Sequence, residues 1–230
     1  MNAPVRARAA LFDLDGTLLD TAADLAAALN VLLAEEGREP LPLATIRPHV
    51  STGAIAVVHT GFPEIAVGSS GFEALRLRFL DHYRAALAVH TCLFPGFEAV
   101  LATLEANALP WGVITNKAAW LTEPLLDELG LLARAACVVS GDTLAVRKPH
   151  PEPLLLASER INVPVADCVY VGDALRDVQA ARAAGMVPLG ARYGYLNASE
   201  APDTWPVAGW LEEPADLLPW LRLDRHGAVH

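Results

Sequence analysis

Short apolar runs alternate with helical stretches along most of the chain. After about residue 90, four runs are each followed by a polar or helical stretch, namely ALPWGVIT, ACVVS, DCVYVG and MVPLGA. This alternation predicts a parallel sheet with helices on both of its faces. The run RAALFD near the N-terminus is expected to be a strand of the same sheet. Residues 207–211 and 214–222 are expected to add an edge strand and a helix, ahead of a frayed C-terminus.

Residues 20–88 follow a different pattern, in which apolar positions recur at helical spacing. The segment TAADLAAALNVLLAEEG predicts a helix that begins after Thr21 as its N-cap and ends near Gly37. A second stripe predicts another helix with its apolar face in a core: Phe72, Leu75, Phe79, Tyr83 and Leu87. We therefore predict an α/β protein whose sheet domain, residues 1–19 and 89–230, is interrupted by a helical domain.

Composition limits the classes of function that fit this chain. The 230 residues, 53% of them hydrophobic, suffice for one core with a smaller insert. A formal net charge of -10 argues against binding nucleic acids or anionic membranes, which need a basic surface. No apolar segment is long enough for a signal peptide or a membrane span. The three cysteines are widely spaced without a C-x-x-C pair, so we expect structural thiols and a cytoplasmic protein.

The most informative stretch is DLDGTLLD, at the end of the first predicted strand. Strand side chains alternate, so Asp13 and Asp15 lie on one side of the chain, where they can hold a metal ion. An EF-hand loop is excluded, because counting from Asp13 places Leu18 at the sixth position, which requires glycine. The remaining alternative is a strand that ends in an acidic turn without a metal site. The residues that follow the other predicted strands argue against this alternative.

Ligands of open α/β sheets bind beyond the carboxyl ends of the strands. The residues that follow the other predicted strands can bind a phosphate group or a cation: Thr115, Asn116, Lys148, Asp173 and Asp177. The hydroxyl and the amide after the second strand suit phosphate oxygens. A positive side chain such as Lys148 is needed to balance carboxylates and phosphate, and the chain has only one other lysine, Lys117.

Together these strand ends resemble those of a known family. The motifs D-x-D-G-T, T-N, K-P and G-D-x-x-x-D occur in the order shown by the haloacid dehalogenase superfamily of phosphatases, and the resemblance covers the whole chain. It implies a Rossmann-like parallel sheet core with an inserted helical cap domain, residues 20–88. It also implies an aspartyl-phosphate intermediate, with Asp13 as the nucleophile and Asp15 as the general acid and base.

The resemblance assigns roles to the remaining motif residues. Magnesium would be held by Asp13, Asp173 and the backbone carbonyl of Asp15, because a negative nucleophile needs a hard cation to approach a phosphate dianion. Three residues would bind the phosphoryl oxygens: Thr115, Asn116 and Lys148. Asp177 would orient the metal shell, and Gly16 lets the chain turn close to the phosphate.

Particular residues separate the branches of the superfamily. Asp15 favours phosphate esters, since the dehalogenase branch lacks an aspartate there. Phosphonoacetaldehyde hydrolases and sugar-phosphate mutases use a cap lysine, whereas residues 20–88 contain none. The resemblance therefore implies a phosphatase, and a catalytically silent phosphate-binding regulator is the alternative of another class.

The sequence does not identify the substrate. The segment IRPHVSTGA resembles the cap loop that meets the substrate, and its candidate specificity residues are Arg47, His49, Ser51, Thr52 and Gly53. Arg47 could pair with a substrate carboxylate. The chain resembles the bacterial phosphoglycolate phosphatase group and, within it, the N-acetylmuramic acid 6-phosphate phosphatase branch, and both substrates bear a carboxylate. We expect a monomer or homodimer that binds a small phosphate ester, without nucleic-acid or membrane partners.

Overall fold

A single parallel sheet forms the centre of the larger domain. The computed structural model describes residues 6–223. The sheet has the strand order β5-β4-β1-β6-β7-β8, and every neighbouring pair is parallel, which confirms the predicted parallel sheet. Its strands are β1 (Ala9–Phe12), β4 (Trp111–Ile114), β5 (Cys137–Val139), β6 (Cys168–Gly172), β7 (Val187–Ala191) and β8 (Gly209–Leu211).

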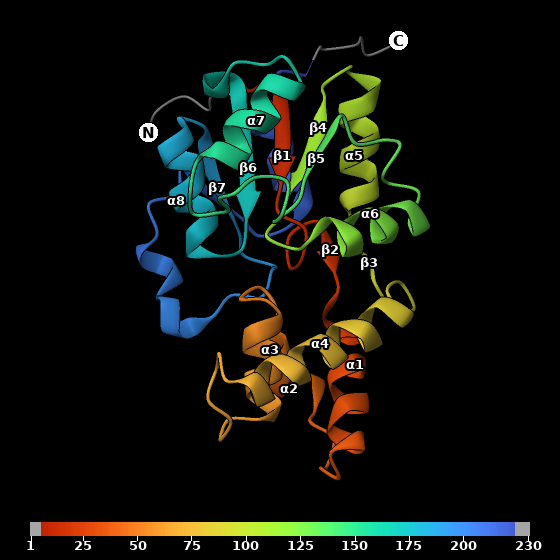
Figure 1. Cartoon of the computed structure of the whole chain (residues 1–230). Helices are drawn as coiled ribbons and strands as arrows, with labels where there is room; N and C mark the ends of the chain where they lie inside the picture. The colour runs from red at the N-terminus through yellow and green to blue at the C-terminus, as the bar shows by residue number, and fades with distance from the viewer. Residues whose placement is uncertain (1–5, 224–230) are drawn as a thin grey trace.

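Helices cover both faces of this sheet, as Figure 1 shows. Alternate side chains of β1 point to opposite faces, so Leu11 packs in one apolar cluster and Phe12 in the other. The Phe12 ring meets Phe97 edge to face, with centroids 5.3 Å apart. The Leu11 cluster includes α7 (Glu152–Arg160) and α8 (Leu175–Ala184), and the Phe12 cluster includes α5 (Phe97–Ala106) and α6 (Ala119–Glu128).

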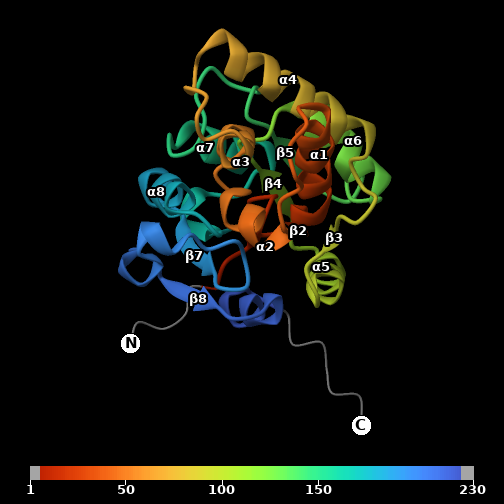
Figure 2. The same cartoon turned by 90° about the horizontal axis from the view of Figure 1, so that it is seen from below.

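A smaller helical unit lies beyond the carboxyl ends of the central strands (Figures 1 and 2). The chain enters this unit through β2 (Leu19–Asp20) and returns through β3 (Cys92–Leu93), which pair antiparallel. Between them lie α1 (Ala22–Glu35), α2 (Leu43–Ile46), the 3-10 helix η1 (Arg47–His49), α3 (Ala54–Gly61) and α4 (Ser70–Ala85). The apolar stripe of α4 faces inward, because Phe72 and Phe79 are fully buried. Figure 2 shows α1, α3 and α4 lying over the end of the sheet.

Three local predictions differ from the structure. Thr21 is not a side-chain N-cap: its hydroxyl donates instead to Asp15, an acceptor that tertiary folding brings 2.7 Å away. The segment after β8 is the 3-10 helix η5 (Pro214–Trp220) and not an α-helix; Pro219 within it has no N–H to donate. The edge strand starts at Gly209, two residues later than predicted. The predicted frayed C-terminus after residue 223 lies outside the described residues.

The sequence predicts structural thiols and no membrane span, and the cysteines and helices of the structure can be compared with these predictions. Cys137 and Cys168 are buried in the sheet, while Cys92 is exposed on β3. Burial raises the pKa of Cys137 to about 11, so this thiol stays protonated at neutral pH. No helix within residues 6–223 is long and apolar enough to cross a membrane.

Asp24 links the start of helix α1 to the segment that returns from the helical unit to the sheet. It lies in the first turn of α1, is buried, and accepts hydrogen bonds from the backbone N–H groups of His90 and Thr91 at 3.0 and 2.8 Å. The Thr91 hydroxyl donates to the same carboxylate at 2.7 Å. One side chain therefore fixes the returning chain beside the outgoing helix.

We expect Asp24→Ala to lower the free energy of unfolding by about 2–4 kcal/mol, because buried donors of Thr91 lose their acceptor. Chemical denaturation followed by circular dichroism measures this change. The control is Asp81→Ala on the exposed side of α4, for which we expect a change within about 0.5 kcal/mol. Equal losses in the two variants would contradict this role of Asp24.

Candidate active site

The candidate site forms where the central strands end. Because β1 lies between β4 and β6, the residues that follow these three strands meet at one edge of the sheet. The side chains brought together there are Asp13, Thr115 and Asp173, and all three are at least 95% buried. Crossover connections leave β1 on both sides, which makes this edge the topological switch point of the sheet.

Three carboxylates converge at this edge. Ligand oxygens of Asp13, Asp173 and Asp177 all lie within 4.8 Å of one another. The Lys148 ammonium lies 2.8 Å from Asp13 and 2.8 Å from Asp177. Burial, together with the charges of Asp13 and Asp177, raises the pKa of Asp173 to about 7. Burial and the Asp13 charge also raise the pKa of Asp177. The site therefore has an excess of negative charge.

Lys148 is held by hydrogen bonds to both its side chain and its backbone. Its ammonium donates to the Ile114 carbonyl at 2.8 Å and to the Tyr170 hydroxyl at 2.7 Å. The Asn116 amide group donates to the Lys148 carbonyl at 2.9 Å, and its oxygen accepts the Lys148 N–H at 3.1 Å. The Asn116 side chain thus fixes the Lys148 loop. The Thr115 hydroxyl oxygen accepts the N–H of Lys117 at 3.1 Å.

Asp173 shows what kind of group fits this cluster. Its Oδ2 accepts from the Ser51 hydroxyl at 2.5 Å and from the Tyr195 N–H at 2.9 Å. Its Oδ1 is buried and has no hydrogen-bond partner among residues 6–223. Buried carboxylate oxygens are normally satisfied, and magnesium prefers hard oxygen ligands. The orphaned oxygen and the uncompensated charge therefore fit a divalent cation held by Asp13 and Asp173.

Gly16 lets the chain pass close to this cluster. Its φ of +83° lies in the left-handed region, and a Cβ at this position would overlap Asp173 and Tyr195. Only glycine therefore permits this turn beside the carboxylates.

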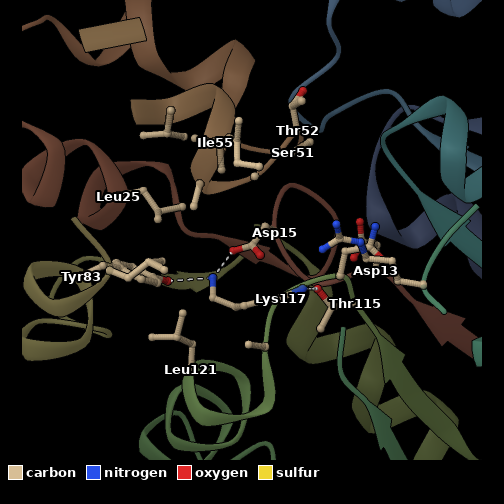
Figure 3. Close-up of a pocket in the computed structure, with 18 of the residues that line it drawn as sticks. Asp13, Asp15, Leu25, Ser51, Thr52, Ile55, Tyr83, Thr115, Lys117 and Leu121 are labelled. Carbon is tan, nitrogen blue, oxygen red and sulfur yellow. Dashed lines mark hydrogen bonds and ion pairs between the residues drawn. The ribbon is translucent and has the colours of Figure 1, made fainter. Parts of the chain in front are cut away.

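Asp15 points into a neighbouring network of polar side chains (Figure 3). Its Oδ1 accepts from Lys117 and from the Thr21 hydroxyl, both at 2.7 Å. Lys117 also donates to the Tyr83 hydroxyl of α4 at 3.0 Å. The sequence patterns predict Tyr83 as a core residue and Lys117 as a residue after a strand, and they do not predict a contact of either with Asp15. The scarcity of lysine and the place of Lys117 directly after Thr115 and Asn116 were the available signals.

A cavity of about 430 Å³ lies between the sheet edge and the helical unit. Asp13, Asp15 and Thr115 line its core side, while three of the five candidate specificity residues, Ser51, Thr52 and Gly53, line the side of the helical unit. Its apolar wall is formed by Leu25, Val50, Ile55, Leu80, Trp120 and Leu121. Figure 3 shows Leu25 and Ile55 across the cavity from Leu121.

Two of the candidate specificity residues do not line this cavity. Arg47 forms an ion pair with Asp20 at 3.0 Å and lies 4.4 Å over the Tyr195 ring, and His49 also lies outside the lining. Three other arginines, which no sequence motif marks as candidates, do line it: Arg76, Arg147 and Arg176. The packing of the helical unit on the core determines which arginines face the cavity. This packing cannot be predicted from a local sequence motif.

Comparisons with known proteins place this geometry in a family. Residues 10–191 match the family described as haloacid dehalogenase-like hydrolase. The chain belongs to this family. It is 45% identical over 207 residues to the phosphoglycolate phosphatase of Xylella fastidiosa strain Temecula1, covering 90% of each chain. It is 43% identical over 216 residues to the N-acetylmuramic acid 6-phosphate phosphatase of Pseudomonas putida, covering 93% of this chain and 95% of the relative.

A solved structure of this family has the same fold. The crystal structure of a predicted phosphoglycolate phosphatase from Haemophilus somnus matches with a TM-score of 0.79 and 25% identity, covering 92% of this chain and 96% of the other. This haloacid dehalogenase-like hydrolase is a phosphatase with a Rossmann-type α/β fold, as the strand-end motifs predict.

Asp173 makes the stability of the metal-free protein depend on pH. Its pKa of about 7 in the folded chain, against 3.8 for the ordinary group, means that the folded state binds the extra proton between these values. The stability from this proton is present below about pH 4 and is lost as the pH rises through about 7. We expect the melting temperature in EDTA to fall by at least about 3 °C from about pH 5 to about pH 8.

Magnesium should offset this loss, and more so at the higher pH, because carboxylates bind the metal in their deprotonated form. The matched variant Asp173→Asn should flatten the pH dependence and remove the magnesium response. Scanning fluorimetry with EDTA or magnesium measures both effects. A magnesium shift that is independent of pH and of Asp173 would refute this assignment.

Proposed function

We propose that this phosphatase hydrolyses a small phosphate monoester that carries a carboxylate, with 2-phosphoglycolate as the first candidate. The observation that supports this most strongly is the placement of Asp13 at the cavity floor, beside Lys148 and within the acidic cluster. In-line attack by a buried carboxylate needs a neighbouring positive charge and a site that excludes water. The phosphoglycolate phosphatase of Xylella fastidiosa is consistent with the proposal.

The proposed reaction has two steps. Asp13 accepts hydrogen bonds from the Leu14 N–H and Lys148 on its Oδ1, which leaves Oδ2 as the oxygen to attack phosphorus. The ester P–O bond breaks as an aspartyl phosphate forms, and Asp15 gives its proton to the leaving oxygen. Asp15 then takes a proton from the water that releases phosphate and restores Asp13. Phosphoryl oxygens would bind Thr115, the backbone N–H of Asn116 and Lys148.

Magnesium fits the donor set of this site. It would be held by Asp13, Asp173 and the backbone carbonyl of Asp15, with Asp177 orienting the shell and fixing Lys148. When bound, the cation supplies the positive charge that offsets repulsion between the nucleophile and a phosphate dianion.

We also propose that residues 20–88 act as a cap over a core of residues 1–19 and 89–230. Contacts between the two parts occur at the site itself, where Ser51 bonds Asp173 and Tyr83 bonds Lys117. A segment that closes in this way excludes water from the reacting groups and contributes to substrate choice. Thr52 and Gly53 would meet the substrate from the cap, whereas Arg47 and His49 would act indirectly.

A second candidate substrate, N-acetylmuramic acid 6-phosphate, is favoured by the size and apolar wall of the cavity. Its volume of about 430 Å³ lies in the range of roughly 300–1,000 Å³ that holds drug-sized ligands. A two-carbon ester leaves most of this space and its apolar wall without contact. The relative from Pseudomonas putida is named for this sugar phosphate.

Arg147 is our candidate for binding the substrate carboxylate. It lines the cavity and directly precedes Lys148, and its guanidinium forms no hydrogen bond or ion pair within residues 6–223. The other two arginines of the lining are already engaged, since Arg76 pairs with Glu73 and Arg176 donates to the Ser51 carbonyl. A free guanidinium matches a carboxylate with two parallel hydrogen bonds.

We expect magnesium-dependent phosphate release from 2-phosphoglycolate or N-acetylmuramic acid 6-phosphate, with kcat/KM above that for hexose phosphates and nucleotides. The higher value of the two identifies the substrate. Asp13→Asn should retain the fold but lose more than about a thousandfold in kcat, because an amide is a poor nucleophile. No release from any ester by the native chain would favour the silent phosphate-binding regulator, and full activity of Asp13→Asn would exclude the mechanism.

We expect Arg147→Gln to raise KM for the carboxylate-bearing substrate by at least about tenfold, the effect of losing a charged hydrogen bond. An ester without a carboxylate should be affected less than about threefold. Arg47→Gln is the matched comparison and should change KM less, because its guanidinium is held by Asp20. If the two arginines exchange these effects, the carboxylate site lies at the cap loop.

A further inference from the structure

We infer that Lys117 and Tyr83 position Asp15 as the proton donor, so that the acid is fully oriented only when helix α4 lies over the core. The inference rests on the proposed phosphatase mechanism and adds two positioning residues to it. Figure 3 shows the chain of contacts from Tyr83 through Lys117 to Asp15.

Lys117 is held at its backbone by Thr115 and at its ammonium by Asp15 and Tyr83. Its backbone N–H donates to the Thr115 hydroxyl, and the side chain then extends along the cavity floor to Asp15. The ammonium also lies 4.6 Å from the centre of the Tyr83 ring, a distance typical of a cation–π contact. The geometry leaves Lys117 little freedom to reach other partners.

Burial makes these contacts necessary for Lys117. Its side chain is only 8% exposed and that of Asp15 only 16%. Within residues 6–223, the ammonium has Asp15 and Tyr83 as its polar partners. An ammonium so poorly hydrated is stable only when partners replace the lost water. Burial raises the pKa of Tyr83 to about 12, so the tyrosine accepts this hydrogen bond as a neutral hydroxyl.

The consequence for Asp15 is a fixed carboxyl plane. Lys117 and Thr21 both donate to Oδ1, so Oδ2 is the oxygen available to carry the proton. In the first step that proton passes from Oδ2 to the ester oxygen as its bond to phosphorus breaks, while Lys117 keeps all of its protons. A rotation of the carboxyl group would move Oδ2 away from the leaving oxygen and slow this step.

Tyr83 connects this arrangement to the cap. It belongs to α4, is 1% exposed, and brings the hydroxyl of a cap helix to a core lysine. When α4 moves away from the core, Lys117 loses one of its two polar partners and its aromatic contact. Proton transfer thereby depends on the position of the cap, whereas Asp13 and Lys148 are held by core residues.

The test compares esters whose leaving groups need a proton to different degrees. An alkyl phosphate substrate needs the acid, whereas p-nitrophenyl phosphate releases a stable anion that does not. Lys117→Met should lower kcat for the alkyl ester by about a hundredfold, the usual contribution of a general acid. We expect a loss below about tenfold for p-nitrophenyl phosphate and KM values within about threefold of the native ones. Tyr83→Phe, which keeps the ring, should show the same preference with a loss of about fivefold.

Three matched variants make the result specific. Lys117→Met should cost little further activity in an Asp15→Asn background, because residues that act as a unit are not additive. Lys117→Arg should restore part of the alkyl-ester activity. Tyr193→Phe, which removes a buried hydroxyl without a partner in residues 6–223, should affect both ester classes equally. Tyr83→Phe carries the test if Lys117→Met fails to fold.

The possible results separate this inference from the proposed function. Equal losses for the two ester classes, or full additivity with Asp15→Asn, would overturn the positioning role while the phosphatase mechanism stands. No phosphate release from any ester by the native chain would overturn both. A selective loss with poor leaving groups in both Lys117→Met and Tyr83→Phe supports the inference.

Discussion

The ion pairs of Lys148 are the interaction on which the site depends. Its ammonium lies 2.8 Å from both Asp13 and Asp177 and donates to the Ile114 carbonyl and the Tyr170 hydroxyl. Removing an ammonium and its carboxylates from water costs several kcal/mol per ion, and only good geometry offsets this. Those partners come from the end of β1, from β4, from β6 and from α8, so they converge only in the folded sheet. A buried, charged Lys148 is therefore stable only where the strand ends converge, and the carboxylates that converge there need its positive charge.

The same cluster keeps an excess of negative charge. The Lys148 ammonium and the Arg176 guanidinium lie near three buried carboxylates, and the raised pKa of Asp173, about 7, reflects this excess. Such a site repels a phosphate dianion at close range, where buried charges are poorly screened. A bound divalent cation would satisfy the orphaned Asp173 oxygen and offset the excess negative charge. Metal binding and phosphate binding are thus parts of one electrostatic requirement in the proposed mechanism.

Residues directly after strands could be predicted from the sequence, whereas side-chain partners across the cavity could not. Apolar runs identify the strands, and parallel pairing then brings Asp13 and Asp173 to one edge without any knowledge of their contacts. Thr21 has the residue type and position of an N-cap, but it donates to Asp15, which tertiary folding places nearby. Arg47 lies in the expected loop, yet it turns away from the cavity because Asp20 and Tyr195 offer an ion pair and a ring. Helical periodicity likewise marks Tyr83 as a core residue and gives no sign that its hydroxyl reaches Lys117.

Each of the two lysines of this chain pairs with one of the two aspartates that follow β1. Asp13 and Asp15 leave the same strand end, but Asp13 pairs with Lys148 and Asp15 with Lys117. The first pair is enclosed by the core, so in the proposed mechanism the nucleophile would keep its charge partner wherever the proposed cap lies. The second pair includes a contact to α4 through Tyr83, so the proposed acid would respond to the position of that helix. A nucleophile that is always ready and an acid that is oriented on closure would confine ester cleavage to the state in which the cavity is shielded from water.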